Sequence, residues 1–174
     1  TGDNASETIT VNCYAPTVTK DAAAAWDRTI DWTIDKSVGP DLHELFTGED
    51  GTSYYVIALT KNVSDSFSAS GTVTVVNSHP SLPVTVTLVD TISGGIVPTL
   101  DCGGSLVVPP AGSATCGYTA ALPDNAARVN TATISVNGYQ DTDTADIVFG
   151  SPVVLGDPET VNVTDGDLKF GPFS

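Results

Sequence analysis

Three cysteines carry the clearest chemical signal in this sequence: Cys13, Cys102 and Cys116. The last two enclose the segment DCGGSLVVPPAGSATC, in which Gly-Gly and Pro-Pro mark turns between two short strands. A disulfide between them would close a loop of about 15 residues and stabilise the fold by about 3 kcal/mol in the chain-entropy model. Zinc is a poor alternative, because no histidine lies near and the spacing does not fit. Cys13 is left over as a buried free thiol, or as the partner of a cysteine in another chain or outside this sequence.

Histidines and carboxylates supply the residue types of hydrolytic enzymes, but not their patterns. His43 and His79 lie in polar loops, and the sequence has no Gly-x-Ser-x-Gly nucleophile motif. A glycosidase needs two opposed carboxylates in a cleft. Asp27, Asp31 and Asp35 instead alternate along one extended segment, which is typical of a solvated strand face. We therefore expect that the protein is not an enzyme.

A second group of carboxylates has the ligand type that calcium prefers. Asp141, Asp143 and Asp146 are weak metal candidates, because they lack the ligand spacing of a helix-loop-helix calcium site. Asp141 and Asp143 would share one face of a strand, where charges also keep an exposed sheet edge from pairing with other chains. We favour edge protection and expect no metal and no cofactor, with calcium as the alternative.

Two features of the sequence could involve carbohydrate: an aromatic binding platform and sites of glycosylation. Trp26 and Trp32 lie at even spacing on one strand face, as in the aromatic platform of a carbohydrate-binding module, but Ile30 between them favours a place in the core. The Asn-x-Ser/Thr sequons give three glycosylation candidates: Asn4, Asn62 and Asn162.

The composition narrows the class of protein further. The chain has 174 residues, 40% of them hydrophobic and 16% charged, and a formal net charge of −15. So acidic a chain repels nucleic acid and anionic membranes, and no apolar run approaches the roughly 20 residues that span a bilayer. The sequence starts at Thr1 and has no methionine, so we expect any signal peptide or anchor to lie outside it. Together with the predicted disulfide, this indicates an extracellular or cell-surface location.

The elements that carry these residues follow a period of two. In residues 26–36, WDRTIDWTIDK, mostly apolar side chains alternate with Asp and Thr, which predicts a long strand with one buried face. About eight or nine such segments, separated by Gly, Pro, Asn and Asp, predict an all-β, immunoglobulin-like antiparallel β-sandwich. We assign residues 22–150 to the sandwich and 1–21 to an N-terminal strand segment. Residues 151–174 form a C-terminal strand segment, either a donor strand or the start of a next domain.

Several stretches together resemble a known class of repeat. These are CYAPTVTKDAAAAWDRTIDWTIDKSV, SGTVTVVN, the cysteine-bracketed segment with GYTAALPD after it, VNTATISVNG and ADIVFGSP. Over roughly residues 11–165 the chain resembles the immunoglobulin-like conserved-repeat domains of secreted bacterial and archaeal surface proteins, similar to the domain-of-unknown-function-eleven repeats. The resemblance implies a structural or adhesive role without catalytic residues, and a disulfide between Cys102 and Cys116.

The strand-like ends indicate how such a module would work. An incomplete sheet of one copy would accept an extended segment of the next, with apolar side chains filling the groove. The candidates for the donated side chains are two alternating pairs, one in each terminal segment: Ile9 and Val11, and Val161 and Val163. We expect a structural subunit of an extracellular filament or surface layer, which polymerises with copies of itself. The alternative is one domain of a long tandem-repeat stalk or adhesin, and glycans or other surface proteins are further candidate partners.

Overall fold

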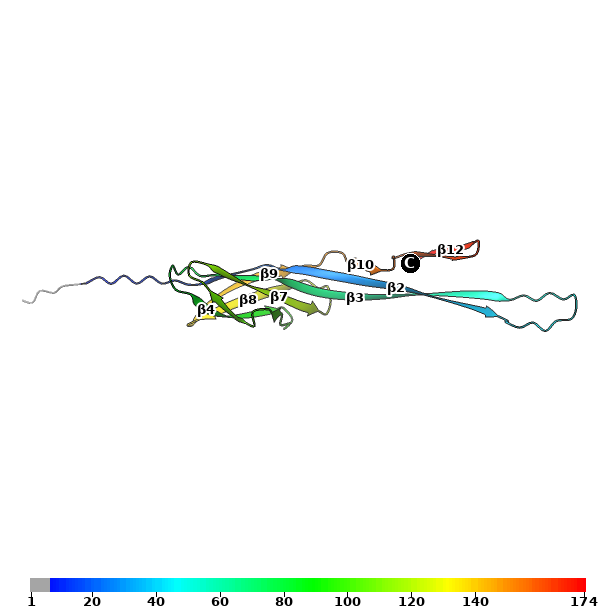
Figure 1. The fold of residues 1–174 in the computed structure, drawn as a ribbon, viewed down its shortest axis with the longest axis horizontal. Helices are drawn as coiled ribbons and strands as arrows, with labels where there is room; N and C mark the ends of the chain where they lie inside the picture. The colour runs from blue at the N-terminus through cyan, green and yellow to red at the C-terminus, as the bar shows by residue number, and fades with distance from the viewer. Residues whose placement is uncertain (1–6) are drawn as a thin grey trace, which may run out of the picture. The chain divides into compact units, whose positions relative to one another are not determined.

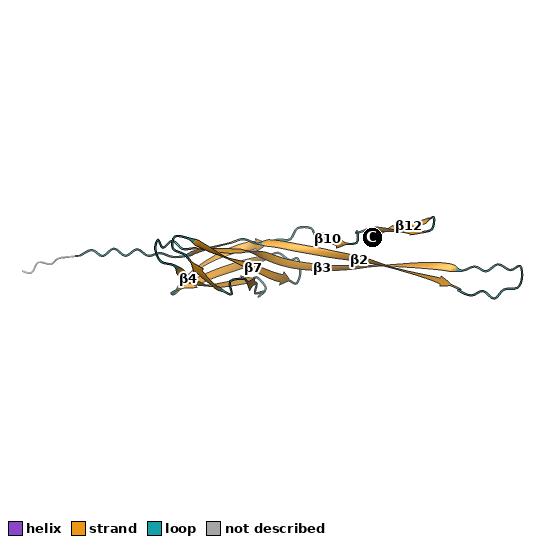
Figure 2. Cartoon of the chain, in the orientation of Figure 1, coloured by secondary structure: helices purple, strands orange, loops and turns teal. Residues whose placement is uncertain are grey.

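The computed structural model describes residues 7–174, and these residues form β-strands and no helix (Figures 1 and 2). This confirms the predicted all-β, immunoglobulin-like sandwich class. The strands are β1 (Thr17–Lys20), β2 (Ala23–Gly39), β3 (Tyr54–Val76), β4 (Val84–Ile92), β5 (Thr99–Leu100), β6 (Ser105–Val108), β7 (Ser113–Leu122), β8 (Arg128–Val136), β9 (Tyr139–Ile147), β10 (Val153–Gly156), β11 (Val161–Asp165) and β12 (Leu168–Phe173).

The chain divides into two compact units. The sandwich unit holds the chain up to Ala25 together with Phe67–Gly150, and the second unit holds Trp26–Ser66 and Ser151–Ser174. Strands β2 and β3 each contribute residues to both units. The sequence assignment had placed residues 26–66 within the sandwich. Residues 26–36 alternate apolar and polar side chains as a core strand does, so periodicity did not predict the division.

The sandwich unit is built from two sheets that share one core. One sheet has the order β6-β4-β8-β9, and the other contains β1, β5, β7 and the C-terminal part of β3. Every second residue of β4 is buried, as its alternating sequence VTVTLVDTI requires. Burial of each such Val, Leu or Ile stabilises the fold by about 1.5–3 kcal/mol. The fully buried aliphatic residues of this core include Val73, Val75, Val86, Val108, Ala132 and Ile134.

A tight turn sets the register of the edge hairpin β8–β9. Asn137 and Gly138 both have positive φ, 48° and 82°, and Val136 pairs with Tyr139 across them. Asn-Gly is the preferred pair for a two-residue turn of this kind, because its twist matches that of the strands. The hairpin therefore places alternate residues of β9 at a defined position on the sandwich edge.

The second unit has strands but little core. Here β10 pairs in parallel with β2 through Val153–Gly156, and β11 pairs with β12 as an antiparallel hairpin. Among its residues only Ile30 and Val163 belong to the buried hydrophobic set. Many large apolar side chains of this unit are exposed instead, among them Ile34, Leu42, Phe46, Tyr54, Tyr55, Val56, Val153, Leu155 and Leu168.

Candidate functional site

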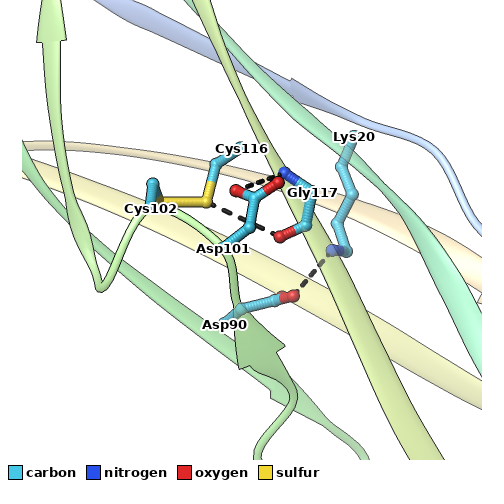
Figure 3. Close-up of a disulfide and its surroundings, with 6 residues drawn as sticks. All are labelled: Lys20, Asp90, Asp101, Cys102, Cys116 and Gly117. Carbon is cyan, nitrogen blue, oxygen red and sulfur yellow. Dashed lines mark hydrogen bonds and ion pairs between the residues drawn. A yellow bond between two sulfur atoms is a disulfide. The ribbon is translucent and has the colours of Figure 1, made fainter.

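The predicted disulfide between Cys102 and Cys116 is present (Figure 3). Its sulfurs lie 2.06 Å apart, and Cys116 is fully buried in β7. Asp101 lies beside the bond and accepts a hydrogen bond from the Gly117 N–H at 2.9 Å. The one cluster of potential metal ligands among the described residues consists of Asp101, Cys102 and Cys116. Sulfurs joined in a disulfide, however, offer no thiolate to a metal. The bond indicates folding in an oxidising compartment.

Cys13 lies outside every strand and is exposed, so the buried-thiol alternative does not describe it. It lines a cavity of about 400 Å³ at one end of the sandwich unit, together with Tyr14, His79 and Tyr139. The rings of Tyr14 and His79 are in contact, with centroids 4.7 Å apart. The thiol is therefore available to solvent at the base of the N-terminal segment.

The two histidines hold loops in place. His79 Nδ1 accepts hydrogen bonds from the N–H groups of Ser81 and Leu82. His43 Nε2 lies 2.8 Å from Ser53 Oγ, whose hydroxyl donates to the carbonyl oxygen of Pro40. A serine whose proton points to a carbonyl is not aligned for removal of that proton by the histidine.

The acidic candidates on β9 bind backbone groups. Asp141 Oδ2 accepts a hydrogen bond from the Val18 N–H at 2.8 Å, and Asp143 Oδ2 accepts one from the Lys20 N–H at 2.7 Å. Asp146, three residues further along β9 than Asp143, is exposed. The first two carboxylates thus occupy the outer edge of β1, where another strand could otherwise pair.

The complementation candidates differ in their surroundings. Ile9 and Val11 belong to an extended segment outside all strands and are 82% and 76% exposed. Val161 and Val163 lie in β11, and the side chain of Val163 is only 8% exposed. The C-terminal pair is therefore already used in a hairpin, whereas the N-terminal pair has no packing partner that would bury it.

A groove in the second unit has the chemistry to receive apolar side chains. It has a volume of about 360 Å³ and is lined by residues of β3, β11 and β12: Tyr55, Ile57, Leu59, Val163, Phe170 and Phe173. Beside it runs a sheet edge, because β7 pairs with β3 only through Phe67–Val76. Within the described part of the chain, the β7-side edge of Tyr54–Ser66 carries no strand partner.

Ion pairs at the surface hold the strands of the second unit together. Arg28 on β2 binds Asp65 on β3 through two hydrogen bonds of 2.8 and 2.9 Å. The hydrogen bond from Arg28 lowers the pKa of the Asp65 carboxyl, although partial desolvation opposes the shift. Lys61 binds Glu159 at 3.0 Å, and Lys36 binds Asp165 at 2.9 Å. These pairs are partly exposed, so each contributes little to stability and the second unit remains weakly held.

The sugar-related candidates are distributed over the second unit. Trp26 and Trp32 are half-buried, and Trp32 donates hydrogen bonds from its backbone N–H to Asp157 and from its indole to Pro158. Neither forms part of a flat exposed strip. Of the sequon asparagines, Asn62 and Asn162 are exposed, and Asn4 lies outside the described residues.

The structure also contains a buried polar group that the sequence analysis did not predict. Lys20, Asp90 and Asn130 meet inside the sandwich unit, and Figure 3 shows Lys20 reaching toward Asp90. A signal was present, since each occupies the inward phase of an otherwise apolar alternation, as Asp90 does after Val86 and Leu88. Reading that phase residue by residue would have identified all three as buried polar groups.

Comparison of this chain with protein-family models, with curated proteins and with solved structures gives no match in any of the three. The strands and their side chains therefore carry the functional argument. Within residues 7–174, no helix has the length and hydropathy needed to cross a membrane.

Proposed function

We propose that this protein is a structural subunit of an extracellular filament or surface layer, assembled head-to-tail by β-strand complementation between copies. The observation that supports this best is the unfinished second unit, which buries Ile30 and Val163 and leaves most of its large apolar side chains exposed. Exposed apolar patches of this kind mark interaction sites, and an open sheet edge is a template for another strand. An incoming strand would supply side chains and backbone hydrogen bonds together.

The segment before β1 has the features of a donated strand. Ile9, Val11 and Cys13 share one face of an extended chain, and Thr8 and Thr10 lie on the other. Between residues 7 and 14 the described structure contains no backbone–backbone hydrogen bond. Its N–H and C=O groups are therefore free to pair with a neighbour. The hairpin already engages Val161 and Val163, so we assign donation to the N-terminal segment.

The groove and the adjacent edge of β3 have the features of an acceptor. Tyr55, Ile57 and Leu59 lie on one face of β3, and the aromatic rings of β12 stand beside them. Transfer of Ile9 and Val11 from water into such a groove would contribute about 1.5–3 kcal/mol for each side chain. The disulfide supports assembly in an oxidising space outside the cytoplasm.

The test changes the two faces of the donor separately. The double variant Ile9→Asp/Val11→Asp places charges on the apolar face, and Thr8→Asp/Thr10→Asp adds the same charge to the opposite face. We expect electron microscopy and sedimentation of the full chain to show filaments for the wild type and the threonine variant, and monomers for the first variant. If the monomeric forms of all three proteins unfold at the same temperature, the loss of filaments is a defect of assembly and not of folding. Filaments of Ile9→Asp/Val11→Asp, or monomeric wild type, would contradict the proposal.

The tandem-repeat alternative uses the same pairing between adjacent modules of one polypeptide. The intact mass of the native material separates the two. A mass near 17.8 kDa supports separate subunits, whereas a much larger mass supports a stalk or adhesin.

A further inference from the structure

Three polar side chains meet in the core of the sandwich unit, and they come from both of its sheets. Lys20 ends β1 in one sheet, and Asp90 on β4 and Asn130 on β8 belong to the other. Lys20 Nζ lies 2.9 Å from Asp90 Oδ2, and the side chains of both residues are completely shielded from solvent. Asn130, also fully buried, donates from Nδ2 to the same carboxylate oxygen at 3.3 Å.

This arrangement leaves two buried oxygens unsatisfied. Asp90 Oδ1 and Asn130 Oδ1 have no hydrogen-bond partner among the described residues. A buried polar atom without a partner destabilises the folded state, and buried ion pairs are often less favourable than apolar residues of the same volume. Stability alone therefore does not account for a polar group at this place in the core.

Burial also changes the pKa of Lys20. Desolvation lowers the pKa of the Lys20 ammonium, against the opposing effects of its hydrogen bond to Asp90 and of the nearby Asp21 and Asp143 carboxylates. The Tyr118 ring of β7, a strand in the same sheet as β1, lies 3.5 Å from Nζ and covers it. A lowered pKa favours the neutral form of the amine, which is the nucleophilic form, and the carboxamide of Asn130 is the electrophile within the group.

We propose that Lys20 and Asn130 form an intramolecular amide cross-link, with Asp90 as the catalytic residue that carries the proton. The lone pair of Lys20 Nζ forms a bond to Asn130 Cγ. The bond from Cγ to Nδ2 then breaks, and Nδ2 leaves as ammonia with its electron pair. Asp90 Oδ2 takes a proton from the attacking nitrogen and delivers it to the leaving nitrogen. The product is a secondary amide, and the reaction needs no oxidant, reductant or cofactor.

The shared oxygen is the observation that supports this assignment. Asp90 Oδ2 is within hydrogen-bond distance of both nitrogens, the one that attacks and the one that leaves. If Asp90 were instead the acyl acceptor, it would have to lose this oxygen as water, and no other carboxyl in the trio could move the proton. The geometry therefore points to Asn130 as the acceptor.

The cross-link would join the two sheets at the strand that follows the N-terminal segment. The disulfide ties Cys116 of β7 to Cys102 near β5, on one side of the sandwich only. A Lys20–Asn130 amide would connect β1 to β8 across the core, so that load applied through the N-terminus reaches both sheets by covalent bonds. This inference does not depend on strand complementation.

High-resolution mass spectrometry of the full chain provides the test. We expect the wild type to be lighter than its disulfide-bonded sequence by the mass of one ammonia molecule, and a proteolytic digest to contain a branched peptide joining Lys20 to Asn130. Asp90→Asn and Lys20→Met should show the unmodified mass. Lys36→Met, which removes an exposed lysine, should keep the loss.

The possible results separate the alternatives. A wild-type chain with the unmodified mass and no branched peptide would overturn the proposal. Loss of one water molecule with a Lys20–Asp90 peptide would overturn the choice of acceptor. Because the wild-type peptide is itself diagnostic, the test holds even where a variant fails to fold. Asn130→Asp offers a second check, since condensation of Lys20 with the new carboxyl should release water instead of ammonia.

Discussion

The backbone N–H of Val18 donates a hydrogen bond of 2.8 Å to Asp141 Oδ2, across the edge where the two sheets of the sandwich unit meet. Asp143 repeats the contact two residues later with the Lys20 N–H. Val18 pairs with Val75 of β3 on its other side, so the carboxylates stand where a further strand would add. The two aspartates satisfy backbone donors and block the edge at the same time.

Replacement of Asp141 by Ala should therefore weaken the sandwich unit. It leaves the Val18 N–H without its charged acceptor, and hydrogen bonds to charged groups contribute about 1.5–3 kcal/mol. We expect a fall of that size in the free energy of unfolding, measured by denaturant titration. Asp146→Ala is the matched control, because Asp146 lies on the same strand but is exposed. Equal effects of the two variants would show that the hydrogen bond is unimportant.

The disulfide gives a second prediction. Its sequence separation is 14, and in the chain-entropy model closure of a loop of this size is worth about 3 kcal/mol. The double variant Cys102→Ser/Cys116→Ser should lose about that much stability in thermal or denaturant unfolding. Cys13→Ser should lose almost none, since its thiol is exposed and unbonded. If Cys13→Ser destabilised the chain equally, the assignment of the structural role to the disulfide would be wrong.

Much of the fold follows from local patterns in the sequence. The alternation in β4 and the short Cys102–Cys116 loop each concern neighbouring residues, and each predicted the observed structure. The Asn137-Gly138 turn is an equally local feature of the sequence. The division of β2 and β3 between two units did not follow. Residues 26–36 alternate as a core strand does, but only Ile30 among them is fully buried, because burial depends on which distant segments pack there.

The contact among the buried residues Lys20, Asp90 and Asn130 could not be predicted from the sequence either. Lys20, Asp90 and Asn130 are separated by 70 and 40 positions, so their meeting depends on the topology of the two sheets. The inward phase of each residue was visible in the sequence, but the contact was not. Likewise, the alternation of Asp141 and Asp143 indicated a strand edge, while the edge they protect belongs to β1.

Ile30 and Ile34 provide a third prediction, because they lie on the same face of β2 in different surroundings. Ile30 is fully buried, whereas Ile34 is 60% exposed. We expect Ile30→Ala to lower the free energy of unfolding by about 2–5 kcal/mol and Ile34→Ala to change it by less than about 0.5 kcal/mol. Chemical denaturation of the monomer would measure both. Similar losses would show that Ile34 is covered in solution.

The fourth prediction concerns acid, and it follows from the Arg28–Asp65 pair. The hydrogen bond from Arg28 lowers the pKa of Asp65 from its ordinary value of 3.8. A carboxyl with a lowered folded-state pKa stabilises the fold above its unfolded-state pKa, and that contribution is lost as the pH falls through the folded-state value. Asp65→Asn should thus be less stable than the wild type at neutral pH, and the difference should shrink as the pH falls below about 4.

Unfolding curves of the two proteins between neutral and strongly acidic pH would measure that difference. Asp167→Asn is the control, because Asp167 is exposed and forms no ion pair among the described residues, so its curve should run parallel to that of the wild type. A gap between wild type and Asp65→Asn that stays constant into acid would mean that the asparagine disturbs packing. In that case the charge of Asp65 would not hold β2 against β3.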